Sequence, residues 1–211
     1  MLRVIITDDH PVVLKGLKEI ISEGFDDVTI DVSTKGYDLL SKINNNDYDI
    51  VILDISLPDI NGLEVLKEIK KRKRKLHVLI LSMYPEENYA VRALKDGAQG
   101  YLSKVSASDE LVLAVRKILS GKKYVSPAFA EKMMLDFESD TGKPPHENLS
   151  DRELQVLSMI GKGKAVKEIA GELHLSANTV RTYRARILEK IGLKGTNELI
   201  HYAIKHNLTE Q

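Results

Sequence analysis

Five side chains suited to phosphate chemistry stand at the ends of apolar runs in the first half of this chain. They are three carboxylates, a hydroxyl and an amine, namely Asp8, Asp9, Asp54, Ser82 and Lys104. Carboxylates gathered at one spot repel one another and need a cation, and Mg²⁺ suits them because it binds carboxylates, water and substrate phosphates. A lysine is a compact charge suited to a phosphate oxygen. Together the five offer what a phosphoryl group needs as it is transferred to a carboxylate.

The apolar runs before these side chains have the pattern of buried parallel strands. Residues 48–53 are almost continuously apolar, which is typical of a strand covered on both faces. Strands are predicted at residues 2–7, 28–32, 48–53, 77–82 and 100–103, with helices that begin near residues 11, 34, 63, 88 and 111. Their alternation predicts a five-stranded, doubly wound parallel sheet. Ligands bind at the carboxyl ends of the strands in such sheets, so we expect the five side chains to converge at that edge.

Each of these residues has a plainer interpretation when it is considered alone. Asp54 is followed by loop residues and could simply cap the next helix. His10, beside the acids, could bind a metal, but we predict a loop position that faces solvent. The basic run Lys70–Lys75 has the composition of a localisation or nucleic-acid signal, yet blocks of like charge usually face water, and we favour that interpretation. The phosphate hypothesis therefore depends on the whole set at successive strand ends.

Composition limits the remaining possibilities. A chain of 211 residues suits one large domain or two small ones, and 43% hydrophobic with 29% charged residues predicts a globular protein with a buried core. The absence of cysteine excludes a disulfide framework and thiolate catalysis. No apolar run reaches the roughly 18 residues of a membrane span. The first residues lack the pattern of a signal peptide, so we expect a cytoplasmic protein with no membrane partner.

The chain changes character after residue 121. Residues 122–147 contain one potential helix, at residues 127–137, and then prolines, a glycine and charges, which indicate a linker. From residue 148 to 211 the pattern is wholly helical, and four short helices predict a small bundle. This last part holds ten Lys or Arg against seven Asp or Glu, a net charge of +3, which leaves −3 for residues 1–147. The asymmetry indicates two domains with different partners.

Two of the predicted C-terminal helices have the pattern of a helix-turn-helix. Lys167–Leu173 is followed by a turn at His174 and Leu175, and then by a helix for which Ser176 is a good N-cap. The polar face of this last helix carries Thr179, Arg181, Thr182, Tyr183, Arg184 and Arg186. A basic helix that begins with hydroxyl residues suits the major groove of DNA. A solvated helix face would show the same pattern.

Residues 1–121 resemble the receiver domain of two-component response regulators. The residues that carry the resemblance are Asp8-Asp9, Asp54 with Pro58 and Gly62 after it, Ser82, and Tyr101-Leu102-Ser103-Lys104. The resemblance implies a flavodoxin-like fold. It also implies that Asp54 is the phosphoacceptor, which takes its phosphoryl group from a sensor histidine kinase.

The same resemblance implies roles for the residues around Asp54. The Mg²⁺ ligands would be Asp8, Asp9, Asp54 and the backbone carbonyl of Ser56. Ser82 and Tyr101 would be a switch pair, in which the hydroxyl moves to the phosphoryl group and the aromatic ring turns inward. Lys104 would complete the site.

Residues 148–206 resemble the LuxR-type DNA-binding domain. The matching segments are Leu149–Leu154, Lys167–Ala170 and Ser176–Tyr183. The resemblance implies that Arg181 and Thr182 read bases. The implied phosphate contacts are Lys167, Thr179, Tyr183 and Arg186.

A receiver followed by a LuxR-type domain resembles the NarL/FixJ family of response regulators over nearly the whole chain. The implied function is a phosphorylation-activated transcription regulator that binds a histidine kinase and promoter DNA and forms a homodimer on activation. The resemblance implies that it is not a dedicated enzyme, with autodephosphorylation left open. One rival is a phosphatase of the haloacid dehalogenase type, but that chemistry needs a second carboxylate where this chain has Ser56. The other rival is a regulator that ignores phosphate, against which the complete acidic set argues.

Overall fold

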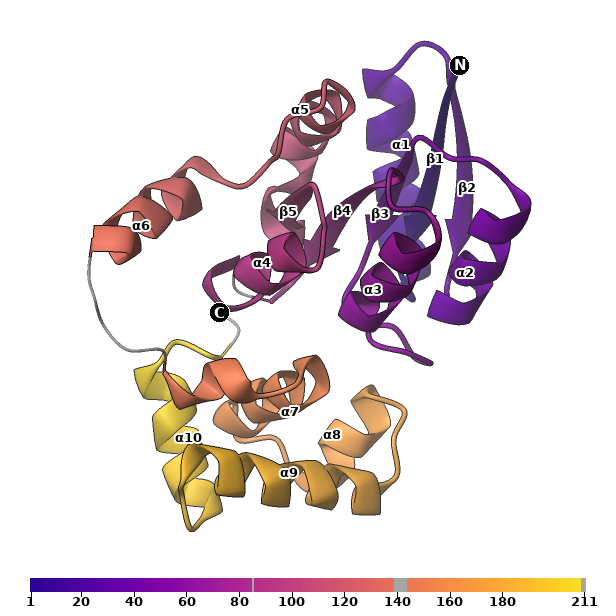
Figure 1. The fold of residues 1–211 in the computed structure, drawn as a ribbon. Coiled ribbons are helices and arrows are strands. Elements are labelled where there is room, and N and C mark those ends of the chain that lie inside the picture. Colours follow the sequence, from indigo (N-terminus) through magenta and orange to yellow (C-terminus); the bar gives the residue numbers. More distant parts are fainter. Residues whose placement is uncertain (85, 139–143, 210–211) are drawn as a thin grey trace. The chain divides into compact units, whose positions relative to one another are not determined.

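A parallel five-stranded sheet forms the first part of the protein in a computed structural model that describes residues 1–84, 86–138 and 144–209 (Figure 1). The strands are β1 (Leu2–Thr7), β2 (Val28–Ser33), β3 (Ile50–Leu53), β4 (His77–Ser82) and β5 (Gly100–Ser103). They lie in the order β2-β1-β3-β4-β5, and every neighbouring pair is parallel. This arrangement confirms the predicted doubly wound, flavodoxin-like sheet.

Helices cover both faces of this sheet because its strands are apolar on both faces. Val4 and Ile6 of β1 belong to the core beneath the first and last helices of the sheet domain, and Ile5 between them is equally buried. Since side chains alternate along a strand, burial of all three requires a layer on each side. The helices are α1 (Pro11–Gly24), α2 (Gly36–Asn45), α3 (Gly62–Arg72), α4 (Glu86–Lys95) and α5 (Ala107–Leu119), with a 3-10 turn η1 (Lys104–Ser106) before α5.

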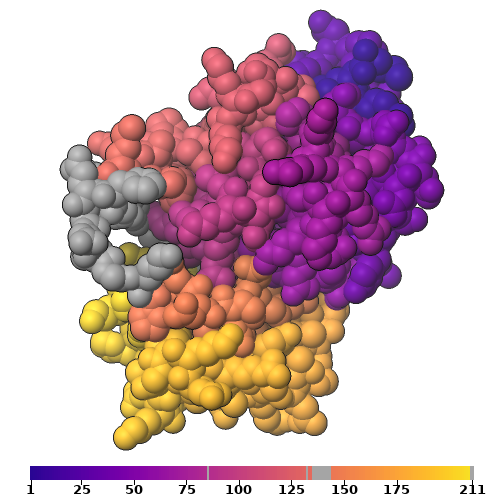
Figure 2. Space-filling view, in the orientation of Figure 1, coloured from indigo at the N-terminus to yellow at the C-terminus, as the bar shows by residue number. Residues whose placement is uncertain are grey.

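The second part of the chain is all-helical, as predicted. The described chain separates into two compact units, residues 1–134 and 135–211, and helix α6 (Pro127–Glu138) lies across that division. The elements after it are η2 (Pro145–Asn148), α7 (Asp151–Gly161), α8 (Val166–Glu172), α9 (Ala177–Ile191) and α10 (Thr196–Lys205). In this unit α7 packs against α9 and α10, and α8 packs against α9. Figure 2 shows the surface of each unit, coloured along the sequence.

Local sequence explains several of the element ends. Ser150 and Glu153 form a capping box at the start of α7, with each side chain accepting a hydrogen bond from the other's backbone N–H. Helix α6 agrees with the helix predicted in the linker. Residues 139–143 of that linker and residues 210–211 at the end of the chain lie outside the described residues.

Some helices are longer than the apolar pattern predicted. Helix α5 begins at Ala107 and not near residue 111, because its first turn carries polar residues that add no apolar signal. Helix α3 continues to Arg72, so the first part of the basic run lies in a helix. Within that run, Lys71 pairs with Glu68 at 2.7 Å, which supports the interpretation as a solvated, locally neutralised surface.

Among the described residues, the structure has no helix that is long and apolar enough to cross a membrane.

Candidate functional site

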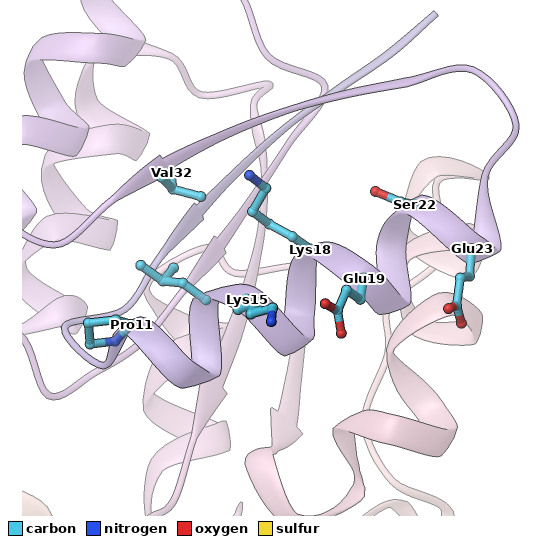
Figure 3. A pocket seen from close by; sticks show the side chains of 8 residues that line it. Pro11, Lys15, Lys18, Glu19, Ser22, Glu23 and Val32 are labelled. Atoms are coloured by element: carbon cyan, nitrogen blue, oxygen red, sulfur yellow. The ribbon is translucent and has the colours of Figure 1, made fainter.

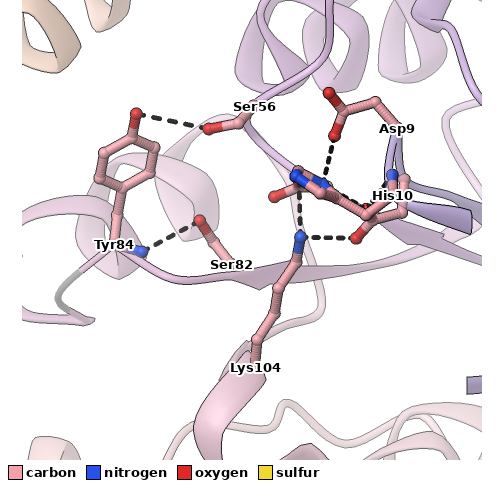
Figure 4. A network of polar contacts seen from close by, with 8 residues as sticks. Asp9, His10, Ser56, Ser82, Tyr84 and Lys104 are labelled. Atoms are coloured by element: carbon pink, nitrogen blue, oxygen red, sulfur yellow. Dashed lines mark hydrogen bonds and ion pairs between the residues drawn. The ribbon is translucent and has the colours of Figure 1, made fainter. Parts of the chain in front are cut away.

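Lys104 joins two carboxylates at the carboxyl-terminal edge of the sheet (Figure 4). Asp8 follows β1 and Asp54 follows the neighbouring strand β3, and the N–H of Asp54 donates to the carbonyl of Thr7 over 2.9 Å. The Nζ of Lys104 lies 2.5 Å from Asp8 Oδ2 and 2.8 Å from Asp54 Oδ2. Asp8 and Asp54 are 1% and 2% exposed. The structure therefore brings three of the predicted residues together as two buried carboxylates with one amine between them.

The charges of this cluster do not balance. Burial raises the pKa of the Asp54 carboxyl to about 6, and the attraction of Lys104 opposes this effect while the charge of Asp8 adds to it. Burial alone would lower the pKa of Lys104, but the carboxylates of Asp54 and Asp8 outweigh it, and the pKa of the amine is raised. One ammonium thus faces two buried carboxylates. A buried excess of negative charge costs free energy, so the site favours a further cation.

Asp8, Asp9 and His10 form a compact donor group beside this pair. One possible ligand atom from each residue lies within 4.8 Å of the other two. The Nδ1 of His10 is 2.7 Å from Asp9 Oδ1 and 3.2 Å from Asp8 Oδ1, although the His10 side chain is 65% exposed. The imidazole therefore faces solvent, as predicted, and also contacts both acids. Oxygen donors next to an excess of negative charge fit a hard cation such as Mg²⁺.

Ser82 on β4 and Tyr101 on β5 meet around the backbone of Tyr84. The N–H of Tyr84 donates to Ser82 Oγ over 3.2 Å, and the hydroxyl of Tyr101 donates to the carbonyl of Tyr84 over 2.7 Å. The Tyr101 ring is fully buried, and this burial holds the pKa of its phenol well above the ordinary value, so the hydroxyl remains a neutral donor. Tyr84 also accepts a hydrogen bond at its own hydroxyl from Ser56 Oγ, over 3.3 Å (Figure 4).

The loop after Asp54 is tightly packed against the start of α3. The N–H of Gly62 donates to the carbonyl of Ile55 over 2.9 Å, and Asn61 caps α3 by accepting from the N–H of Leu63 over 2.9 Å. A Cβ at position 62 would stand 2.1 Å from the carbonyl oxygen of Asp54. Glycine is therefore required there by the close approach of two backbone segments, which holds the Asp54 loop in place.

A groove of about 570 Å³ runs along α1 (Figure 3). It begins at Pro11, which follows the Asp8–Asp9–His10 group in the chain. Lys15 and Lys18 line it together with Glu19 and Glu23. Because basic and acidic side chains share its lining, the groove does not select a ligand by charge.

The second unit places the predicted DNA contacts on the outside of its helix-turn-helix. Residues with exposed or partly exposed positions are Lys167 on α8 and Thr179, Arg181, Thr182, Tyr183 and Arg186 on α9. On the opposite face of α9, Val180 and Ile187 are fully buried. The first turns are ordered by Asn178, which accepts from Arg181 Nη1 over 2.8 Å and from Thr182 Oγ1 over 3.0 Å. Helix α9 thus has one apolar face for its own unit and one polar face available to a partner.

Comparison with known proteins agrees with both halves of this description. Residues 4–116 match the response regulator receiver domain, and residues 147–203 match the luxR family of bacterial regulatory proteins. The chain is 35% identical over 209 residues to the response regulator UvrY of Escherichia coli K12, covering 99% of this chain and 96% of that protein. The chain belongs to the NarL/FixJ family of two-component response regulators. It has a receiver domain and a LuxR-type DNA-binding domain, and it is a transcription regulator, as the sequence predicted.

Other members of the family match over similar lengths. The oxygen regulatory protein NreC of Staphylococcus carnosus is 33% identical over 216 residues, which cover 99% of this chain and 100% of that protein. Among solved structures, the RcsB response regulator of Salmonella typhimurium has 25% identity and a TM-score of 0.62, covering 96% of this chain and 98% of that chain. RcsB bound to promoter DNA with the phosphomimetic BeF₃⁻ has 25% identity and a TM-score of 0.58, with the same coverage.

Sequence reasoning missed one residue of the receiver site. Tyr84 lies between Ser56 and the Ser82–Tyr101 pair, and it is 4% exposed. Its only sequence signal is its position two residues after Ser82, in a loop that has no periodicity. The contact with Ser56 joins residues 28 positions apart, so it depends on the pairing of β3 with β4.

Proposed function

We propose that Asp54 is the phosphoacceptor of this response regulator and takes its phosphoryl group from a sensor histidine kinase. An Asp54 Oδ would attack phosphorus in line, so that the P–O bond forms as the bond to the donor nitrogen breaks. The bridging position of Lys104, within 2.8 Å of both Asp8 and Asp54, is the observation that carries the proposal. An amine held at the acceptor oxygen is placed to stabilise the equatorial oxygens of the arriving phosphoryl group.

The acidic donors would hold Mg²⁺. We assign Asp8, Asp9 and Asp54 as its side-chain ligands, together with the backbone carbonyl of Ser56. The excess of buried negative charge and the compact Asp8–Asp9–His10 group support this choice. When bound, the ion neutralises charge on the phosphoryl oxygens. The Lys104 amine would then exchange its contacts with the two carboxylates for a contact with a phosphate oxygen.

Ser82 and Tyr101 are proposed as the switch pair. Ser82 Oγ now accepts from the backbone of Tyr84, and the buried Tyr101 hydroxyl binds the carbonyl of the same residue. If Ser82 turns its hydroxyl to a phosphoryl group on Asp54, it gives up this contact, and the backbone N–H of Tyr84 loses its bond to Ser82. A local change at Asp54 is thereby passed to the start of α4.

The LuxR-type domain is proposed to bind promoter DNA through α9. Arg181 and Thr182 would read base edges, with phosphate contacts from Lys167, Thr179, Tyr183 and Arg186. The exposed polar face of α9, and the DNA-bound structures of the related RcsB, support this assignment. Because DNA is the partner, we place the protein in the cytoplasm. The domain boundaries proposed are residues 1–121 for the receiver, 122–147 for the linker and 148–211 for the DNA-binding domain.

Phosphodonor labelling tests the central assignment. Wild-type protein incubated with Mg²⁺ and radiolabelled acetyl phosphate is expected to take up covalent label at one site. Asp54→Asn is expected to take up none. Asp109→Asn, which neutralises an exposed carboxylate in the first turn of α5, is the matched control and should be labelled normally. Undiminished labelling of Asp54→Asn would show that another residue accepts the phosphoryl group.

The rival functions make different predictions in the same assay. A phosphatase of the haloacid dehalogenase type would turn over a generic phosphate ester many times, whereas the proposed receiver should take up about one phosphoryl group and release it slowly. A regulator that works by protein contacts alone would not be labelled. The presence of Ser56 where the phosphatase needs its second carboxylate favours the receiver.

A further inference from the structure

The segment after α5 extends the sheet at its open edge. β5 is the outermost strand, and Tyr124 forms a parallel bridge to it at Gly100. The N–H of Tyr124 donates to the carbonyl of Gln99 over 2.9 Å, and the N–H of Tyr101 donates to the carbonyl of Tyr124 over 3.0 Å. A Cβ on Gly100 would stand 2.8 Å from the Tyr124 carbonyl oxygen, so the glycine permits this approach. The linker therefore begins as an ordered part of the receiver.

Two residues further on, Ser126 binds the start of α4. Its N–H donates to Glu86 Oε1 over 3.0 Å and its hydroxyl donates to Glu86 Oε2 over 2.6 Å. The same hydroxyl accepts from the N–H of Phe129 over 3.1 Å, so Ser126 is also the N-cap of α6. Both carboxylate oxygens of Glu86 are used, and hydrogen bonds to an ionised group are among the stronger ones. One side chain thus ties the first turn of α4 to the first turn of α6.

Tyr101 connects this segment with the proposed switch. Its backbone N–H binds Tyr124, while its hydroxyl binds the carbonyl of Tyr84. Tyr84 in turn donates its N–H to Ser82, and Glu86 follows Tyr84 by two positions in the chain. A movement at Tyr84 therefore reaches the linker through the hydroxyl and strand of Tyr101, and a movement at Glu86 reaches it directly through Ser126.

We infer that Glu86, Tyr124 and Ser126 form a latch that holds the start of α6 against the receiver and opens when the loop after β4 moves on phosphorylation. The inference rests on the proposed function of Asp54 and names the element through which that site acts on the rest of the chain. A shift of Glu86 breaks both of the bonds that join Ser126 to α4. Opening frees the cap of α6 and the bridge at β5, and so loosens the attachment of the linker that leads to the DNA-binding domain.

The first test needs no phosphodonor. In the full chain, Glu86→Ala removes the acceptor of both Ser126 bonds, and Glu87→Ala removes the neighbouring, exposed carboxylate of the same helix turn as a matched control. We expect amide hydrogen exchange to accelerate at least tenfold at Tyr101 and Ala130 in Glu86→Ala but not in Glu87→Ala. These amides bind Tyr124 and Ser126 carbonyls, not Glu86, so their exchange reports opening of the whole latch. Unchanged exchange at both amides in Glu86→Ala would overturn the latch.

The second test measures what the latch controls. Unphosphorylated Glu86→Ala is expected to bind promoter DNA about fivefold or more tightly than wild type, within the usual range of coupling between sites. Wild type with beryllofluoride and Mg²⁺ should show the same faster exchange at Tyr101 and Ala130. Wild-type affinity in Glu86→Ala, or unchanged exchange in wild type that is saturated with beryllofluoride, would overturn the coupling.

Labelling separates this inference from the proposed function. Glu86→Ala should still be labelled at Asp54 by acetyl phosphate. In the interactions that the structure describes, Glu86 does not contact Asp8, Asp9 or Asp54. If Glu86→Ala is labelled normally but its amide exchange at Tyr101 and Ala130 is unchanged, only the latch is contradicted. If wild type takes up no label, the phosphoacceptor assignment is contradicted. The exchange comparison of Glu86→Ala with Glu87→Ala would still decide whether the latch exists.

Discussion

At the scale of single residues, Asp54 is held in a state that disfavours its own ionisation. Burial is the main reason, and the nearby Asp8 charge adds to it, so the pKa of Asp54 rises from 3.8 to about 6. The folded protein therefore binds the Asp54 proton more tightly than the unfolded chain. Stability associated with this group is present at low pH and is lost as pH rises from about 4 to about 6.

Replacing Asp54 should therefore stabilise the metal-free protein. In Mg²⁺-free buffer at pH 7, we expect Asp54→Asn to increase the free energy of unfolding by about 1–3 kcal/mol, since each pKa unit corresponds to about 1.4 kcal/mol. The gain should fade as pH is lowered towards 4, because wild-type Asp54 is then protonated. Urea unfolding across this pH range would measure it. If Asp54→Asn is less stable than wild type at pH 7, burial does not destabilise the ionised Asp54 carboxylate. Asp109→Asn serves as the control.

At the scale of elements, the acidic loop depends on how closely α3 approaches it. The start of α3 lies directly on the backbone at Asp54, where Gly62 has no room for a side chain. Helix α1 contains a glycine of the opposite kind, because a Cβ on Gly16 would meet nothing within 4 Å. The same substitution should therefore have opposite effects in these two helices.

We predict that Gly16→Ala stabilises the receiver by about 0.5–1 kcal/mol, since alanine loses less backbone entropy in a helix. Gly62→Ala should instead destabilise it by several kcal/mol and slow labelling of Asp54, because the loop must shift to admit the methyl group. Thermal unfolding and acetyl phosphate labelling of the two variants would test the pair. Equal stability of both variants would show that the loop at residue 62 is more adaptable than its packing indicates.

At the scale of the whole molecule, DNA binding is expected to use two kinds of side chain, those that read bases and those that contact phosphates. Arg181 lies near the start of α9 with its guanidinium on Asn178, and Arg186 lies further along the same polar face. We expect Arg186→Ala to weaken binding to all DNA sequences alike and to reduce the salt slope by about one unit. Arg181→Ala should cost roughly 1–3 kcal/mol at the preferred site and change base preference. An unchanged preferred site after Arg181→Ala would exclude it as a base reader.

Oligomeric state belongs to the same scale. A four-helix unit with a net charge of +3 offers a small footprint, so tight specific binding is expected to need two copies on paired half-sites. We predict that the unphosphorylated protein is mostly monomeric and that beryllofluoride with Mg²⁺ shifts it to a dimer. Sedimentation of wild type with and without the mimic would show the change, and Asp54→Asn should not respond. An unchanged mass together with unchanged DNA affinity would rule out activation by dimerisation.

The sequence alone determined the architecture and the identity of the chemical groups. The apolar run of β3 and its alternation with helical segments predict the sheet, and parallel strands necessarily place Asp8, Asp54 and Lys104 at one edge. The capping box at Ser150 and the turn before α9 were equally readable, because they depend on residues a few positions apart. Such local and periodic signals survive without a structure, since hydrophobic burial and helix capping act on the residue types themselves.

Only the tertiary structure decided which polar groups meet across long separations. Ser56 and Tyr84 are 28 positions apart, Glu86 and Ser126 are 40 positions apart, and no periodicity marks either pair. The latch residues read as an ordinary helix start and an ordinary linker, and Asp59 reads as a loop residue although it accepts from the N–H groups that begin α2. A polar side chain in a loop has many possible partners in the chain. Which one it binds is set by the packing of the apolar core, which fixes the distant backbone segments that carry the polar groups.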